Sequence, residues 1–342
     1  MRLKFGALAW LMSGVVFCLC GQSALQAENL RLYVDNSRGD TISVIDMNSF
    51  KVADVIKVGA ERVHAIAVRP DGRVLFTTSE ADHTLRIINT STLKVTGVIK
   101  LTGKPNQCAV TPDGRYVVVP IRDGDSINIV DTTQQKIVKV LPIKEPHNAV
   151  NIGSNRYTFV SSMGSHEINV VDFETMSYSA VIPVGGRPRP FVVTPDGKTM
   201  YVAVSYLHGF NIVDVAEKKV VEKVEIPSEH PAPGKVRQFE TPDTYTHGLA
   251  LSPDGGEIWV TSLLDDSIYI YDLKRRKVTG RLATGDGPNW VAFSPDGKYV
   301  AVSNTDSDDV SIFDAKARVQ LAKVKVGKVP KRIAIATAPA DE

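Results

Sequence analysis

Residues 294–314 read SPDGKYVAVSNTDSDDVSIFD, and they contain two phrases that recur along the chain. The first phrase is Ser294-Pro295-Asp296-Gly297, and the second is a run of alternating apolar residues that ends in Asp314. Proline presets φ at the start of a turn and glycine tolerates positive φ, so the first phrase predicts a tight turn. Alternation with a period of two predicts a short strand.

The turn phrase recurs, with Arg, Thr or Ser before Pro-Asp-Gly, at residues 69–72, 111–114, 194–197 and 252–255. A degenerate copy, Gly153-Ser154-Asn155, occupies the expected place between the second and third of these. The second phrase also recurs, ending at Asp46, Asn89, Asp131, Asp172, Asp214 and Asp272. Successive copies of its last residue, from Asp46 to Asp314, are 43, 42, 41, 42, 58 and 42 residues apart. A repeat of about 40–45 residues is typical of a β-propeller blade.

Each repeat is interpreted as four short strands. In the second repeat these strands are expected at residues 65–68, 74–78, 84–89 and 95–101. Seven repeats predict an all-β, seven-bladed β-propeller with four antiparallel strands per blade. The first repeat lacks its first strand, and residues 331–337 at the other end of the chain form an unassigned one. We therefore expect the C-terminal strand to join the N-terminal blade and close the ring, which removes free sheet edges.

The repeats resemble those of the YVTN-repeat β-propellers. The resemblance rests on Leu32-Tyr33-Val34-Asp35-Asn36 followed by residues 42–46, and on residues 299–304 followed by 310–314. Relatives of this kind include surface-layer proteins, secreted propellers associated with quinoprotein dehydrogenases, and the haem-binding propeller of a nitrite reductase. That last propeller has eight blades, whereas this sequence shows seven. The motifs consist of turn and core residues, so the resemblance implies the fold and leaves the function open.

The first 27 residues are interpreted as a secretory signal peptide. Arg2 and Lys4 precede an apolar run, and Leu25-Gln26-Ala27 fits a cleavage site. Residues 28–342 are then expected to form a single propeller domain. The whole chain has 342 residues, 40 basic and 38 acidic, for a net charge of +2. Removal of residues 1–27 takes away two basic residues and no acidic one, so the mature chain is neutral and nucleic-acid binding is disfavoured.

The predicted signal peptide points to a protein exported to the periplasm or secreted, although no intramolecular disulfide is expected in it. Cys18 and Cys20 lie in the predicted leader, which leaves Cys108 alone and unable to form an intramolecular disulfide. No later stretch approaches the roughly 20 apolar residues of a membrane span. We expect a periplasmic or secreted protein that does not span a membrane.

All seven histidines fall on one side of the predicted ring. This side, the upper rim, carries the connections between consecutive blades and those between the second and third strands of a blade. The histidines are His64, His83, His147, His166, His208, His230 and His247. Polar residues favour loops, which explains their exposure but not their restriction to one rim. A binding site on this rim is therefore expected.

Alignment on the first strand of each blade places one polar residue per blade at the top of the central channel. These residues are His64, Asn106, Asn148, Arg189, His247, Asn289 and Lys331, with His147 beside Asn148. Such a ring suits an anionic group, ordered water or a metal with anionic ligands; alternatively, it solvates the channel mouth. His64, His147 and His247 are candidate metal ligands, because imidazole suits zinc, copper or haem iron. The identity of any cofactor is left open.

The 58-residue spacing marks an insertion at residues 227–246 on the upper rim. It contains four prolines, which disfavour a helix, and four side chains that could cover a ligand, namely His230, Arg237, Phe239 and Tyr245. Long loops on rigid scaffolds often carry function. A passive surface insertion is the alternative.

These features predict a periplasmic binding protein that holds a small ligand, metal or tetrapyrrole-like cofactor at the upper rim and assists a redox or cofactor pathway. A protein–protein interaction scaffold is the first alternative. A metal-dependent hydrolase or lactonase, or a redox enzyme, is the second. Catalysis is disfavoured because the sequence has no Gly-x-Ser-x-Gly motif and no phosphate-binding glycine loop. No catalytic residue is assigned, and the expected partner is a small ligand or a periplasmic protein.

Overall fold

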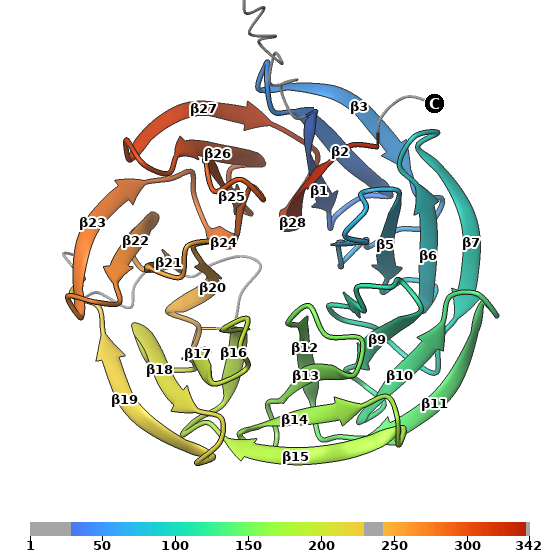
Figure 1. Ribbon diagram of the computed structural model, residues 1–342. Helices are drawn as coiled ribbons and strands as arrows, with labels where there is room; N and C mark the ends of the chain where they lie inside the picture. Colours follow the sequence, from blue (N-terminus) through green and yellow to red (C-terminus); the bar gives the residue numbers. More distant parts are fainter. Residues whose placement is uncertain (1–28, 229–241, 340–342) are drawn as a thin grey trace, which may run out of the picture.

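The computed structural model describes residues 29–228 and 242–339, which form seven four-stranded antiparallel sheets arranged as a ring (Figure 1). Each sheet is one blade, and its strands run in order from the central channel to the outside of the ring. The predicted fold is confirmed. Blade 1 contains β28, β1, β2 and β3, and each later blade contains the next four strands along the chain.

The inner half of each blade consists of its first and second strands. The first strands, which surround the channel, are β28 (Pro330–Thr337), β4 (Ala67–Val68), β8 (Ala109–Val110), β12 (Pro146–Asn151), β16 (Pro188–Val193), β20 (Thr246–Leu251) and β24 (Pro288–Phe293). The second strands are β1 (Leu30–Asn36), β5 (Val74–Ser79), β9 (Tyr116–Ile121), β13 (Tyr157–Ser162), β17 (Thr199–Val204), β21 (Glu257–Ser262) and β25 (Tyr299–Asn304).

The outer half consists of the third and fourth strands. The third strands are β2 (Thr41–Asp46), β6 (Thr84–Asn89), β10 (Ser126–Asp131), β14 (Glu167–Asp172), β18 (Gly209–Asp214), β22 (Ser267–Asp272) and β26 (Asp309–Asp314). The fourth strands, at the periphery, are β3 (Lys51–Lys57), β7 (Lys94–Lys100), β11 (Lys136–Pro142), β15 (Ser177–Pro183), β19 (Lys219–Glu225), β23 (Lys277–Ala283) and β27 (Val319–Lys325).

Blade 1 closes the ring by combining both ends of the chain. β28 pairs antiparallel with β1, in a register that places Thr337 opposite Leu30 and Ile333 opposite Val34. The backbone N–H of Ala338 also donates to the carbonyl of Asn29 at 2.7 Å. The closing strand therefore comes from the opposite end of the chain, as the repeat pattern predicts.

The hydrophobic cores lie between neighbouring blades. One cluster joins Leu32 and Ile333 of blade 1 to Ile312 of blade 7, and another joins Phe159 of blade 4 to Phe191 of blade 5. Because each blade buries its apolar side chains against the next one, no single blade completes a core.

The aspartates of the repeated phrases stabilise the turns of the lower rim, the end of the ring opposite the upper rim. In the turn between β8 and β9, Thr111 Oγ1 donates to Asp113 Oδ1 at 2.6 Å, and that oxygen also accepts the backbone N–H of Arg115. In the turn between β2 and β3, Asp46 Oδ1 accepts the backbone N–H of Ser49 at 2.7 Å. These carboxylates stabilise local backbone turns, which leaves the upper rim as the place for a site.

Candidate functional site

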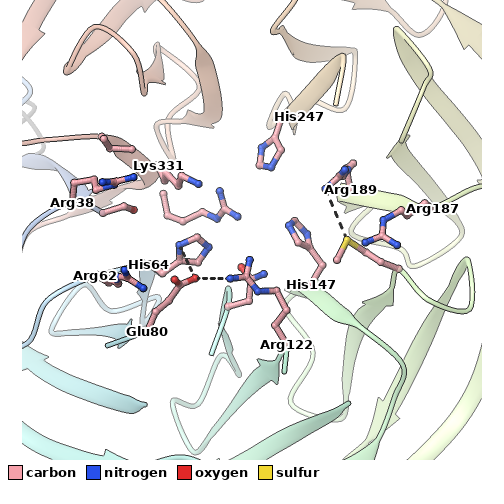
Figure 2. Close-up of a pocket in the computed structure, with 15 residues that line it drawn as sticks. Arg38, Arg62, His64, Glu80, Arg122, His147, Arg187, Arg189, His247 and Lys331 are labelled. Atoms are coloured by element: carbon pink, nitrogen blue, oxygen red, sulfur yellow. Dashed lines mark hydrogen bonds and ion pairs between the residues drawn. The ribbon is translucent and has the colours of Figure 1, made fainter. Parts of the chain in front are cut away.

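A hollow of about 570 Å³ lies at the upper end of the central channel and is called the funnel here (Figure 2). Its volume is in the range of small-molecule pockets. Fifteen residues line it: Ser37, Arg38, Arg62, His64, Glu80, Asn106, Arg122, His147, Met163, Arg187, Arg189, His247, Val329, Lys331 and Arg332.

One residue per blade occupies the equivalent place at the start of each first strand. The strand registers identify it, because Pro146, Pro188, Thr246 and Pro288 each lie opposite the last residue of the neighbouring second strand. The next residue in each blade is the equivalent one. In the seven blades these residues are Lys331, His64, Asn106, His147, Arg189, His247 and Asn289.

This register corrects the sequence alignment in blade 4. The equivalent residue is His147, and Asn148 is displaced by one position. Gly153-Ser154-Asn155 replaces the usual Pro-Asp-Gly turn there. Counting back from this altered turn therefore selects a residue one position too late in the first strand. Asn148 lies outside the funnel lining and lines a second hollow lower in the channel.

The structure brings His64, His147 and His247 to the same funnel from three alternate blades (Figure 2). The rings of His147 and His247 meet edge to face with their centroids 6.0 Å apart. Nδ1 of His247 lies 2.9 Å from the carbonyl oxygen of Asn289. Since a carbonyl only accepts, Nδ1 carries a proton and donates it to this contact. Asn289 itself is fully buried behind the funnel wall.

Two of these histidines, His64 and His147, are kept neutral by their surroundings. Burial lowers the pKa values of His64 and His147 well below the usual value, and the positive charge of Arg332 lowers them further. Nδ1 of His64 lies 3.6 Å from a carboxylate oxygen of Glu80. Because the ring is unprotonated, this contact is not an ion pair.

Within residues 29–228 and 242–339, no group of three or more His, Cys, Asp or Glu side chains is arranged to hold a metal ion. The assignment of His64, His147 and His247 as metal ligands therefore gains no support from this arrangement and stays a prediction. Nδ1 of His147 is buried without a hydrogen-bond partner, so this ring retains one nitrogen for a ligand atom.

Positive charge dominates the funnel lining. Its cations are Arg38, Arg62, Arg122, Arg187, Arg189, Lys331 and Arg332, and its carboxylate is Glu80. Glu80 lies 3.2 Å from Lys104 Nζ and 3.3 Å from Arg122 Nη2.

Two further carboxylates compensate arginines at the edge of the funnel. Arg187 pairs with Glu145 at 2.8 Å, and Arg189 pairs with Asp243 at 2.7 Å. The pairs hold both guanidinium groups in place, and the lining keeps an excess of positive charge, which suits an anion.

Arg332 and Asp35 lie at the base of the funnel. The Arg332 side chain is only 2% exposed, donates to Asn289 Oδ1 at 3.0 Å and stacks on the Trp290 ring at 4.3 Å. Asp35 is fully buried, and its Oδ1 accepts the backbone N–H groups of Lys331 and Arg332 at 2.8 and 2.7 Å. Burial raises the pKa of Asp35 to about 7.

Three further upper-rim histidines, His83, His166 and His208, lie outside the funnel lining. His208 bridges blades 5 and 6, because its ring nitrogens lie 2.7 Å from the Ile226 carbonyl and 2.8 Å from Ser262 Oγ. These contacts indicate a structural role. His83 and His166 are absent from the lining as well.

Most of the predicted insertion is not part of the described structure. His230, Arg237 and Phe239 lie outside the described residues. Tyr245 lies at the described end of the insertion, where its ring meets that of Tyr206 at 6.4 Å and its carbonyl accepts the Leu263 N–H. It does not line the funnel, although Asp243 from the same segment reaches Arg189.

Several lining residues were missed by the sequence alignment, including Arg38, Glu80, Arg122 and Met163. They occupy the connections after the second strands of blades 1 to 4. An alignment on the last residue of each second strand would have found Glu80, Arg122 and Met163, because each follows that residue directly.

A family model described as "Lactonase, 7-bladed beta-propeller" matches residues 142–335, which is more than half of the chain. The chain belongs to this seven-bladed lactonase family. The sequence-based assignment to a family of seven-bladed propellers is thereby confirmed. In this lactonase-family propeller, the matched region contains His147, Arg187, Arg189, His247 and Lys331 of the funnel.

Three solved structures share the fold. Hydrazine synthase of Kuenenia stuttgartiensis aligns with a TM-score of 0.70 and 20% identity, over 83% of this chain and 92% of that one. A functionally unknown protein from Desulfotomaculum acetoxidans aligns with a TM-score of 0.74 and 15% identity, over 90% of this chain and 99% of that one. The dihydro-heme d1 dehydrogenase NirN, in complex with DHE, aligns with a TM-score of 0.62 and 17% identity, over 89% of this chain and 74% of that one. A comparison with curated proteins gives no match.

In the described part of the lactonase-family chain, no helix is both long and apolar enough to cross a membrane.

Proposed function

We propose that the funnel binds a small organic anion with more than one carboxylate or phosphate group, and that the protein acts as a binding protein for it. The observation that carries this proposal is the excess of cationic side chains around a hollow of about 570 Å³. Guanidinium groups pair with planar anions through two parallel hydrogen bonds, and desolvation strengthens such pairs. A volume of this size accommodates an organic molecule.

A tetrapyrrole with carboxylate side chains belongs to this ligand class. The structural relative NirN is described in complex with DHE, a ligand of a dihydro-heme d1 dehydrogenase. The donor set fits such a group, because cations ring the funnel and the neutral His147 offers a buried nitrogen that has no partner. His147 would contact the centre of the group and the cations would hold its carboxylates.

Citrate is a suitable first probe for isothermal titration calorimetry. We expect saturable binding to the wild type that weakens as salt is added, since the contacts are ionic. Arg122→Gln and Lys331→Met each remove one charged contact and should weaken binding about 10-fold. Lys274→Met removes an exposed charge between β22 and β23, on the lower rim, and is the matched control. Equal affinity for the uncharged triethyl citrate, or unchanged affinity in both funnel variants, would contradict the proposal.

Lactone hydrolysis is the second candidate function, and membership of the lactonase family favours it. An unprotonated imidazole at His147 would accept a proton from the water that attacks the lactone carbonyl, and would return it to the ring oxygen as the C–O bond breaks. The funnel cations would stabilise the carboxylate that forms. A pH-stat assay with δ-valerolactone tests this function. We expect His147→Gln to lower turnover about 100-fold. Equal acid release by the variant and the wild type would exclude His147 as the base.

The proposal includes export from the cytoplasm, directed by residues 1–27. Cell fractionation of the full-length chain should recover the protein outside the cytoplasm, and a variant without residues 2–27 should remain inside. Cytoplasmic retention of the full-length chain would contradict this part of the proposal.

A further inference from the structure

A second hollow, the lower cavity, lies at the other end of the channel and has a volume of about 700 Å³. Its walls come mainly from β12, β16, β20 and β24 of blades 4 to 7, and Gln107 contributes from the segment before β8 in blade 3. Pro195 and Pro253, in the turns after β16 and β20, lie at its rim. Because those turns belong to the lower rim, the lower cavity opens on the face opposite the funnel.

The chemistry of the lower cavity differs from that of the funnel. Phe191, Leu249, Trp290 and Phe293 are among the residues that form its walls. Asp254 is its ionisable lining residue, and this carboxylate is engaged in its own turn by Ser252 Oγ and the Gly256 N–H. None of the described residues that line it is a cation. An uncharged, largely apolar ligand is therefore the class that it suits.

Two buried carboxamides give the lower cavity a polar end. Gln107 is 7% exposed and Asn148 is 1% exposed, and both line the cavity. Gln107 Oε1 and Asn148 Oδ1 are buried without a hydrogen-bond partner. Buried polar atoms in folded proteins are nearly always paired, so two unpaired acceptors beside an apolar space call for a donor.

Trp290 separates the two hollows. Its ring forms part of the lower cavity, while Arg332 stacks on it at 4.3 Å and His247 lies 6.1 Å away between ring centroids. Arg332 and His247 belong to the funnel lining. Among the described residues, the channel thus has a cationic compartment above this ring and a largely apolar compartment without cations below it.

We propose that the lower cavity binds a neutral aromatic molecule that donates a hydrogen bond to Gln107 or Asn148. The aromatic and aliphatic walls would contact its ring system, and its N–H or O–H group would reach the carboxamides. This site differs from the funnel in residues, charge and ligand class, and it does not depend on the function proposed for the funnel.

The probe is N-phenyl-1-naphthylamine, which is neutral and aromatic, carries one N–H donor, and fluoresces more strongly in apolar surroundings. We expect saturable binding of one probe per chain, with energy transfer from Trp290. The N-methyl analogue lacks the donor and should bind about 10-fold more weakly. The double substitution Gln107→Leu and Asn148→Leu should weaken binding of the parent probe. It should also abolish the difference in affinity between the parent probe and its N-methyl analogue.

Leu251→Trp places a large side chain in the lower cavity from β20. This second variant tests the proposal even if the double variant does not fold. It should prevent binding of both probes. Lys331→Met should leave probe binding unchanged, while citrate binding reports on the funnel separately. The proposal is overturned if the wild type does not bind the probe, if Leu251→Trp binds it with wild-type affinity, or if the N-methyl analogue binds as tightly as its parent.

Discussion

Asp35 carries a fully buried carboxyl group whose neighbours pull its pKa in opposite directions. Burial disfavours the charged form and is the largest influence, whereas the positive charge of Arg332 and two backbone N–H groups favour that form. The net result is a pKa of about 7 in the folded chain against 3.8 for an ordinary aspartate. Between these two pH values the folded state holds a proton that the unfolded state releases, so stability falls as pH rises.

Asp35→Asn keeps the acceptor oxygen for the Lys331 and Arg332 N–H groups and cannot ionise. We therefore expect the variant to gain stability relative to the wild type as the pH rises from 4 to 8, by on the order of 2–4 kcal/mol. Urea unfolding of both proteins at pH 4, 6 and 8 measures this difference. A difference that stays constant across the range would show that Asp35 does not titrate in this window.

The sequence predicted part of the funnel, and the reasons lie in particular residues. His64, Arg189, His247 and Lys331 follow from strand periodicity, because residues at equivalent places in the first strands surround the channel. Glu80 was missed because it lies in a connection, and the alignment counted from the first strands, whereas Glu80 directly follows the last residue of a second strand. The Arg332–Trp290 stack joins two first strands and depends on packing that periodicity does not encode.

The turns between first and second strands show how one element serves two purposes. Gly72 and Gly255 occupy the same place in the turns of blades 2 and 6, with φ of 71° and 72°. A Cβ added at Gly255 would meet nothing within 4 Å, whereas one added at Gly72 would overlap the carbonyl of Thr337 in the closing strand. The turn in blade 2 therefore also packs against the ring closure.

Gly72→Ala and Gly255→Ala form a matched pair at this place. Both should lose about 1 kcal/mol of stability from the positive φ, and Gly72→Ala should lose a further 1–3 kcal/mol or so from overpacking. Urea unfolding curves of the two variants give the difference. Equal losses would show that the Thr337 backbone moves aside without cost.

The strands of the second blade show how far the element level was predictable. The third strand, Thr84–Asn89, was predicted with its observed bounds. The second strand was predicted to end one residue early, because it extends to Ser79. The first strand was expected at residues 65–68 but comprises only Ala67–Val68. The pairing of Val63 with Ser79 is an isolated bridge outside the strand, and alternation of residue types does not reveal such an interruption.

At the scale of the whole molecule, one strand pairing holds the ring shut. β28 covers β1 on the channel side of blade 1, and without it β1 would expose a long hydrogen-bonding edge with Leu32 and Val34 partly uncovered. Exposed strand edges of this kind promote association between chains. The length and spacing of the repeats predicted this closure because they left one blade short of a strand.

Truncation after Val329 removes the closing strand. We expect the shortened chain to form oligomers, with a melting temperature lower by at least about 10 °C, as measured by light scattering and differential scanning calorimetry. A synthetic peptide of residues 330–339 should restore the monomer by adding the missing strand. Val319→Ala, on the outer strand β27, provides a control with little effect. A truncated chain that is monomeric and equally heat-stable would refute this account.

The pairing of β28 with β1 also sets an order of events during synthesis. β1 is the first strand of the described fold to leave the ribosome, and its partner is the last. At 5–20 residues per second, β1 waits on the order of tens of seconds for that partner. During this interval the nascent chain must keep an unpaired edge from contacting other chains, so a chaperone that covers β1 would matter more to yield than one that acts on the finished ring.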